Sequence, residues 1–232
     1  MGRMLFETCR EILLSGRQTL LPCGENSRKK GKRRLLSAIK GGLRSTLPYE
    51  EIGFQIRPLL DCVSERLPAI RRTLQQDIDA LLKIDPAATN PSLVALTYPG
   101  IEALLAYRIA HMLHRGGAPL LARLLSEYAH RETGIDIHPG AEIGAGCAID
   151  HGTGIVIGET AVVEAGVTIY HGVTLGAKSP IGADPKGKRH PTIKRGAVLF
   201  AGATILGGET VIGEGVTVKC GALITHSIEK AP

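Results

Sequence analysis

The sequence has no tryptophan, and aromatic residues make up only 3% of its 232 residues. So few rings offer little surface on which single-stranded bases could stack. The formal net charge is +6, but much of the excess lies in one run, RKKGKRR at 28–34. Such a run is usually a solvated linker. We therefore expect no nucleic-acid partner.

Long apolar runs and paired cysteines are also absent from the sequence. No stretch of eighteen apolar residues occurs, and charged residues interrupt the N-terminal leucines, unlike the core of a signal peptide. The five cysteines are scattered, odd in number and form no CxxC pair, which predicts neither a zinc site nor a disulfide framework. We expect a globular cytoplasmic protein with reduced thiols and no membrane segment.

The N-terminal part carries helical periodicity. Apolar residues recur every three or four positions over 51–83, as on a helix with one buried face. Because proline removes an amide donor, Pro58 and Pro68 are predicted to divide this stretch into successive helices. Further helices are predicted over 99–115 and 119–133, each followed by glycine. Residues 1–134 are thus expected to form a helical N-terminal domain that includes the basic segment 28–34.

After residue 134 the period changes to six. Twelve of thirteen positions in this phase are Ile, Leu or Val, the exception being Ala161. The positions are Ile137, Ile143, Ile149, Ile155, Ala161, Val167, Val173, Ile193, Leu199, Ile205, Ile212, Val218 and Ile224. A six-residue repeat indicates a parallel β-helix in which stacked coils bury a continuous aliphatic core.

The repeat predicts an α+β protein whose residues 135–232 form the β-helix. Three strands per coil require eighteen residues. The interval from Val173 to Ile193 is longer than the repeat allows, so 177–191 is predicted to leave the coil as a protruding loop. Long loops on a rigid scaffold often carry function.

Polar residues interrupt the apolar repeat at a few places. Asp136 and His151 are fifteen residues apart, close to the length of one coil, so they are expected to approach each other on adjacent coils. A carboxylate that orients an imidazole leaves the second ring nitrogen free to accept a proton, and the pKa of histidine suits that task near neutrality. The alternative to a catalytic role is that such a histidine is a structural residue at a corner of the solenoid.

Three motifs in order, DIHP, DHGTGIVIGET and GKRHPTI, resemble those of bacterial and plant serine O-acetyltransferases. The similarity extends upstream through DPAATNPSLVALTYPG and covers roughly residues 70–226. It implies transfer of acetyl from acetyl-CoA to the hydroxyl of L-serine, giving O-acetyl-L-serine and CoA in cysteine biosynthesis. Acetyl-CoA is then a co-substrate, and no metal is expected.

The resemblance also implies roles for single residues. His151 matches the general base and Asp136 the carboxylate that orients it. Asp85 and Asp150 match the acids that hold the substrate ammonium group, although Asp85 could instead cap a helix. Arg189 and His190 match the pair that binds the substrate carboxylate.

For the co-substrate, the resemblance indicates backbone around a glycine-rich set of residues and one lysine that could meet a phosphate. These are Gly176, Ala177, Ala201, Gly202 and Lys219. It further implies a left-handed β-helix, a homotrimer with active sites between subunits, and pairing of trimers into a hexamer through the helical domain.

The sequence departs from the family at several points. Gly176-Ala177 stands where many members have two glycines, and Phe200 replaces a common glycine beside the expected CoA groove. The chain ends at HSIEKAP without the tail that inserts into O-acetylserine sulfhydrylase, so we expect no tight complex with that enzyme.

Three other interpretations remain open. A hexapeptide acetyltransferase could use another hydroxyl acceptor, although a neutral sugar needs no set of charges suited to a zwitterion. A carbonic-anhydrase-like β-helix could hold zinc through histidines such as His138 and His171, although their spacing differs from that family's. A scaffold with an inactive site is the third.

Overall fold

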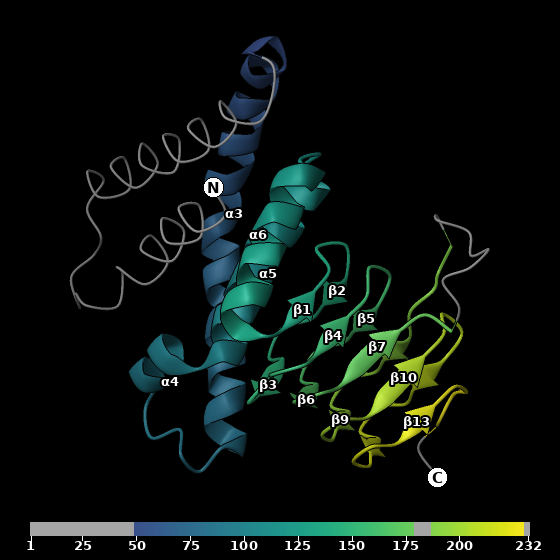
Figure 1. The fold of residues 1–232 in the computed structure, drawn as a ribbon. Coiled ribbons are helices and arrows are strands. Elements are labelled where there is room, and N and C mark those ends of the chain that lie inside the picture. Colours follow the sequence, from purple (N-terminus) through teal and green to yellow (C-terminus); the bar gives the residue numbers. More distant parts are fainter. Residues whose placement is uncertain (1–48, 179–186, 230–232) are drawn as a thin grey trace.

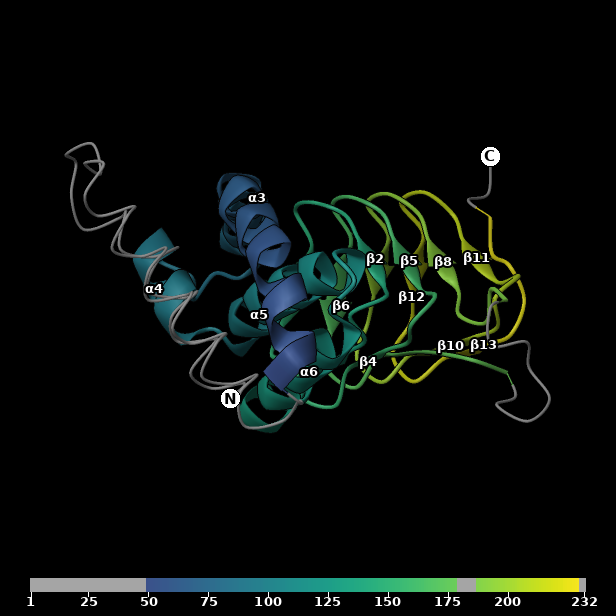
Figure 2. The same ribbon diagram turned by 90° about the horizontal axis from the view of Figure 1, so that it is seen from above.

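The computed structural model describes residues 49–178 and 187–229, and for residues 49–65 it describes the backbone. The basic segment 28–34 and the centre of the predicted loop lie outside these ranges. Four helices precede thirteen short strands along the described chain. The helices gather at one end of a stack of coils formed by the strands (Figures 1 and 2).

The four helices are α3 (Tyr49–Ile84), α4 (Pro91–Thr97), α5 (Pro99–Arg115) and α6 (Pro119–Thr133). The predicted division of the first helix is wrong, because α3 runs without interruption through Pro58 and Pro68. A proline removes one backbone hydrogen bond, at a cost of about 3 kcal/mol in a helix interior. In its C-terminal half the helix is held by a buried face that includes Ile70, Leu74 and Ile78.

Helix α4 was not predicted from the sequence. Its signal is a capping residue followed by proline: the Asn90 side chain accepts a hydrogen bond from Leu93 N–H at 2.9 Å, and Pro91 begins the helix. Both features are typical of a helix N-terminus. The helix has only seven residues, too few for its periodicity to be recognised.

The helices close the first coil of the β-helix. In α5, the Tyr107 hydroxyl donates to Ala141 C=O at 2.6 Å and accepts from Ile143 N–H at 3.0 Å. In α6, the Ser126 hydroxyl donates to Ile137 C=O at 2.8 Å. Backbone groups at the open end of a coil need such partners. The helical part therefore satisfies the edge that stacking leaves unpaired.

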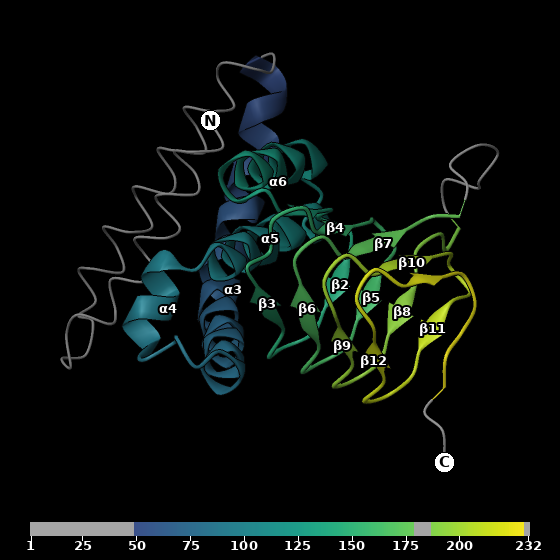
Figure 3. The same cartoon turned by 60° about the horizontal axis from the view of Figure 1, so that its bottom comes forward.

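The strands form three parallel sheets, and each coil contributes one strand to each sheet (Figure 3). The five-stranded sheet contains β1 (Asp136–Ile137), β4 (Val156–Ile157), β7 (Thr174–Gly176), β10 (Thr204–Leu206) and β13 (Leu223–Ile224). The second sheet contains β2 (Glu142–Ile143), β5 (Val162–Val163), β8 (Thr192–Ile193) and β11 (Val211–Ile212). The third contains β3 (Ala148–Asp150), β6 (Thr168–Tyr170), β9 (Val198–Leu199) and β12 (Thr217–Val218).

This architecture confirms the predicted fold class, and three parallel sheets are consistent with a left-handed β-helix. The aliphatic positions of the repeat line a continuous core in which most side chains are fully buried. Among the helices in the described ranges, none alone is long and apolar enough to cross a membrane, and only the bent pair α4 and α5 meets that test together.

The predicted phase of the repeat is wrong from Ile155 to Val173, where the residues in register with the first coil lie two positions later, at Ile157, Val163, Ile169 and Leu175. Ile137 lies beside Ile157, twenty residues later, and not beside Ile155. Both members of each pair Ile135–Ile137 and Ile155–Ile157 are buried, because the residue just before the strand and the second residue of the strand both turn inward. Counting six residues from Ile149 therefore reaches Ile155, which is also buried, and not Ile157, which pairs with Ile137. The first coil is two residues longer than the predicted eighteen.

Candidate active site

The two additional residues are His151 and Gly152. Asp150 lies beside Tyr170 in the next coil, while the N–H of the glycine after His171 donates to Thr153 C=O at 2.9 Å. The chain between Asp150 and Thr153 thus has no counterpart in the second coil. The His151 side chain stands exposed on the resulting bulge.

The bulge requires an unfavourable backbone conformation. His151 has φ +57°, the only positive φ of a non-glycine residue in the described ranges. Such a residue costs about 1–3 kcal/mol and is found mainly where function retains it. Gly152 follows at φ +85°, and a Cβ there would lie 2.4 Å from Ile135 Cδ1. The geometry of this corner therefore depends on glycine and on strain.

An acidic residue from the helical part approaches the same corner. The Asp85 carboxylate accepts from the Tyr98 hydroxyl at 2.6 Å and from Ala87 N–H at 2.8 Å. These two hydrogen bonds, and the nearby charge of His151, lower the pKa of Asp85. The hydrogen bond between Tyr98 and Asp85 also raises the pKa of Tyr98 to about 12. Asp85 is thus an anion at neutral pH, and Asn90 caps the next helix in its place.

Two more groups belong to this corner. The His171 ring lies edge-on to the His151 ring, with centroids 5.7 Å apart. Asp150 lies close enough to Tyr98 for its charge to raise the pKa of the tyrosine. We call Asp85, Tyr98, Asp150, His151 and His171 the His151 corner.

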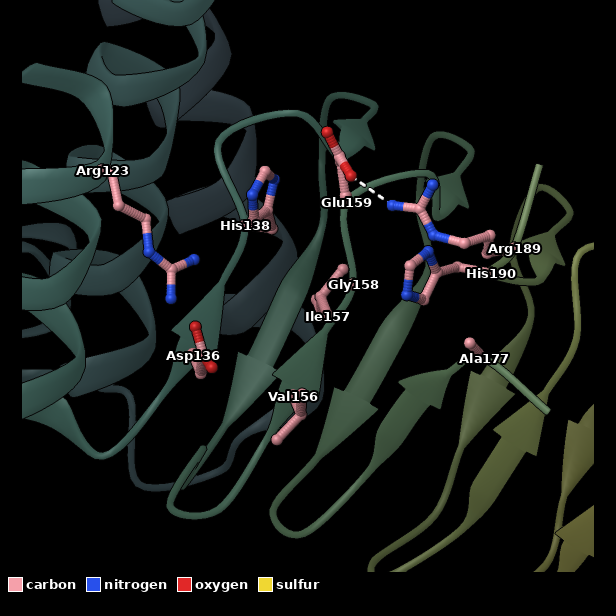
Figure 4. Close-up of a pocket in the computed structure, with 10 residues that line it drawn as sticks. All are labelled: Arg123, Asp136, His138, Val156, Ile157, Gly158, Glu159, Ala177, Arg189 and His190. Atoms are coloured by element: carbon pink, nitrogen blue, oxygen red, sulfur yellow. Dashed lines mark hydrogen bonds and ion pairs between the residues drawn. The ribbon is translucent and has the colours of Figure 1, made fainter. Parts of the chain in front are cut away.

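A separate pocket of about 480 Å³ lies beside strands β1 and β4 (Figure 4). It is lined by Arg123, Asp136, His138, Val156, Ile157, Gly158, Glu159, Ala177, Arg189 and His190. We call it the Arg189 pocket. Asp136, Arg189 and His190, three of the predicted site residues, lie together here.

The side chains of Arg189 and His190 are held differently in the Arg189 pocket. Arg189 Nη2 forms an ion pair with the Glu159 carboxylate (Figure 4). The His190 ring packs on Gly158, where a Cβ would lie only 2.0 Å from its Cδ2. Burial, and then the charges of Arg189 and Lys188, lower the pKa of His190. His190 is therefore neutral at neutral pH.

The structure brings some predicted site residues together and separates others. Asp150 and His151 lie with Asp85 at the His151 corner, while Asp136 lies with Arg189 and His190 in the Arg189 pocket. Among the contacts of the described residues, no hydrogen bond joins the Asp136 carboxylate to the His151 ring of the same chain. The expected approach of these two side chains on adjacent coils is therefore not formed as a hydrogen bond within one chain.

The residues expected to contact CoA divide in the same way. Gly176 ends β7 and Ala177 lines the Arg189 pocket. Gly202 N–H donates to His171 C=O at 2.9 Å, so Ala201 and Gly202 continue the His151 corner into the next coil. Lys219 is exposed one coil further.

The Phe200 ring, exposed by 37%, stacks on Tyr170 with centroids 5.2 Å apart and ring planes 13° apart. Tyr170 neighbours Asp150 in the third sheet. The unusual phenylalanine thus extends an aromatic surface from the His151 corner along the outside of the coils.

Tyr98, Glu159 and Thr160 belong to these sites but were not predicted from the sequence. Tyr98 follows helix α4, which was itself not predicted, and Glu159 and Thr160 lie in the turn between β4 and β5. Only the tertiary fold brings Thr160 to His190, thirty residues later. No group of three histidine, cysteine or acidic side chains that could hold a metal ion occurs within the described part of the chain.

Known proteins similar to this chain in sequence and in structure are serine acetyltransferases. No family model matches the sequence. A plasmid-encoded serine acetyltransferase of Synechococcus elongatus is 49% identical over 86 residues, which are 37% of this chain and 27% of that protein. By sequence the chain thus spans about a quarter of that relative's length.

Solved structures match over nearly the whole chain. Serine acetyltransferase isoform 3 of Entamoeba histolytica, in complex with cysteine, is 35% identical with a TM-score of 0.83, covering 98% of this chain and 78% of its own. The serine acetyltransferase of Neisseria gonorrhoeae in complex with serine is 32% identical with a TM-score of 0.66, covering 97% and 91%.

Proposed function

Because this chain belongs to the serine acetyltransferase family, we propose that it transfers acetyl from acetyl-CoA to the hydroxyl of L-serine. The products are O-acetyl-L-serine and CoA, and the reaction serves cysteine biosynthesis. The observation that carries the proposal is the His151 bulge. A strained, exposed imidazole on an otherwise regular solenoid, beside the anion Asp85, suits a base that acts on the hydroxyl of an amino acid whose ammonium group binds nearby.

His151 is the general base of this reaction. It takes the proton of the serine hydroxyl as the oxygen attacks the thioester carbonyl of acetyl-CoA, and the thiolate of CoA leaves. The carboxylate of Asp136 orients the imidazole and stabilises its protonated form. The histidine then returns the proton to the departing sulfur.

Charges on the two sides of serine select a zwitterion. Asp85 and Asp150 hold the ammonium group, and the low pKa of Asp85 keeps it ionised at neutral pH. Arg189 supplies the positive charge for the substrate carboxylate, and His190 supplies a neutral donor. A neutral sugar would offer these groups no opposite charges and would therefore bind more weakly than a zwitterion.

We propose that the complete site forms between two subunits of a homotrimer. In one chain the His151 corner carries the base and the acids, whereas the Arg189 pocket carries Asp136 and the carboxylate-binding residues. The two sets are chemically complementary, which favours the His151 corner of one subunit facing the Arg189 pocket of its neighbour.

Acetyl-CoA follows the same seam in this proposal. Ala201 and Gly202 continue the His151 corner along the coils, and small residues permit close approach of an extended ligand. Gly176 and Ala177 contribute from the side of the Arg189 pocket. Lys219 is exposed and positioned further along the solenoid, where it meets a phosphate group.

The first test is CoA release from acetyl-CoA with and without L-serine. Release by the wild type is expected to depend on serine, and His151→Ala is expected to lower it by about 10²–10⁴-fold, the usual contribution of general-base catalysis. His226→Ala, which removes an exposed histidine near the end of the described chain, is the matched control. Serine-independent release would refute the acceptor, and full activity of His151→Ala would refute the base.

A second experiment tests the shared site. His151→Ala and Arg189→Ala are each expected to be inactive alone. Co-refolded mixtures are expected to regain activity, because some interfaces then combine two intact halves. If mixed trimers form and stay inactive, the site is not composite, even if the wild type is an acetyltransferase.

A further inference from the structure

Thr160 is the centre of a hydrogen-bond network that ends the 177–191 loop. It follows Glu159 in the turn between β4 and β5. Its Oγ1 accepts from the backbone N–H of Arg189 at 2.9 Å and of His190 at 3.0 Å. Its C=O accepts from Lys188 Nζ at 2.5 Å. One threonine thus contacts three consecutive residues of the KRHP motif.

The same threonine determines which nitrogen of His190 carries hydrogen. Thr160 N–H lies 3.1 Å from His190 Nδ1, and Thr160 Oγ1 lies 2.9 Å from it. Because the two backbone N–H groups occupy both lone pairs of Oγ1, the hydroxyl hydrogen is left to donate to Nδ1. The one lone pair of Nδ1 therefore accepts from both donors in a bifurcated hydrogen bond, and in the neutral ring the hydrogen resides on Nε2.

The surroundings of the ring favour its neutral form. The ring rests on Gly158, with the position of a Cβ there only 2.1 Å from Nε2, so a side chain could not share the space. Arg189, Lys188 and His138 disfavour a charge on His190, and Glu159 favours one, while burial is the largest effect. A second hydrogen on Nδ1 would also oppose both donors of Thr160.

We propose that Thr160 is a positioning residue of the serine-carboxylate site: it holds His190 as a neutral Nε2–H donor and fixes the backbone that presents Arg189. The proposal rests on the proposed function, in which these two side chains bind the carboxylate. Arg189 then supplies the charge and His190 a directed hydrogen bond. Thr160 acts only through them and touches no reacting atom.

Kinetic constants of three variants test the proposal. Thr160→Val removes the hydroxyl with little change of shape and leaves two backbone N–H groups without their acceptor. The KM for serine is expected to rise about 10- to 100-fold, as for loss of buried hydrogen bonds, while the KM for acetyl-CoA changes less than about threefold. Thr160→Ser restores the hydroxyl and is expected to recover most of the affinity.

Thr192→Val is the matched control. Thr192 is the first residue after the KRHP motif and lies in β8, between Val162 and Val211 of the neighbouring strands. A valine there matches its neighbours and removes none of the hydrogen bonds of Thr160, so both KM values are expected to stay within about twofold of wild type. Equal loss of affinity for both substrates in Thr160→Val, or failure of Thr160→Ser to recover, would overturn the proposal.

A second measurement does not depend on activity. In ¹⁵N spectra of histidine-labelled protein, with His190→Gln used for assignment, His190 is expected to carry hydrogen on Nε2 and not on Nδ1 at neutral pH. In Thr160→Val the Nδ1–H or doubly protonated form is expected to increase. A wild-type spectrum with hydrogen on Nδ1 would overturn the proposal, whereas an inactive wild type with the expected spectrum would refute only the proposed function.

Discussion

A buried ion pair joins the helices to the first coil, and Asp77→Asn is its most informative perturbation. Asp77 is 0% exposed and accepts from Arg108 Nε and Nη2, both at 2.8 Å. Arg108 also donates to Ile143 C=O at 3.2 Å and Gly144 C=O at 2.9 Å. Asp77 in turn accepts from Cys147 N–H at 3.1 Å. The pair therefore completes the unpaired edge of the coil.

The expected loss follows from these contacts. Burial raises the pKa of Asp77 although Arg108 and two backbone N–H groups lower it, so desolvation is the dominant effect on this charge. Asparagine keeps the shape but leaves the guanidinium buried without a counter-charge. Two charge-assisted hydrogen bonds of about 1.5–3 kcal/mol each are weakened, and breaking a buried pair costs about 3–5 kcal/mol.

The assay is urea unfolding at one protein concentration, because an oligomer's stability depends on concentration. Asp77→Asn is expected to lower the free energy of unfolding by about 3–5 kcal/mol. Asp79→Asn, the same change two residues along α3 at a half-buried site, is the control and is expected to cost less than about 1 kcal/mol. A loss below about 1 kcal/mol for Asp77→Asn would show that the buried guanidinium does not need its partner.

Two further substitutions test the sites, and a third tests an ion pair outside them. Gly158→Ala places a Cβ 2.0 Å from the His190 ring and is expected to raise the KM for serine at least about tenfold, with urea unfolding nearly unchanged; unchanged KM would contradict the packing. Tyr98→Phe removes the largest cause of the low pKa of Asp85, so this pKa is expected to rise. As the pH is lowered, the variant is then expected to lose its affinity for serine at a higher pH than the wild type does. Coincident pH profiles of the two proteins would contradict this expectation. Glu164→Gln breaks an exposed ion pair with a neighbouring lysine and is expected to change stability by less than about 1 kcal/mol in urea unfolding; a larger loss would show that exposure does not screen the pair.

The six-residue period was sufficient to predict the β-helix. Each aliphatic residue of that phase is forced inward by the same local geometry, as the burial of Ile143 and Ile149 shows. The period did not reveal the bulge, because Ile155 and Ile157 are both aliphatic and both face inward. Strand pairing alone distinguishes them, and pairing is a property of stacked coils.

Helix continuity and site composition needed the same information. Pro58 and Pro68 are helix breakers by local rules, yet α3 continues through both. Motif similarity pointed to Asp136, His151 and Arg189 together. The fold distributes them over two surfaces, because register decides which residues share a face.

The helical and solenoid halves, the aliphatic core and the motifs of a serine acetyltransferase can be recognised in the sequence, since each depends on residues near one another in the chain. The strained bulge at His151 and the contact of Thr160 with His190 become visible only in the folded chain. Hydrogen bonds between coils join residues seventeen to thirty-one positions apart, and a two-residue insertion moves every later contact.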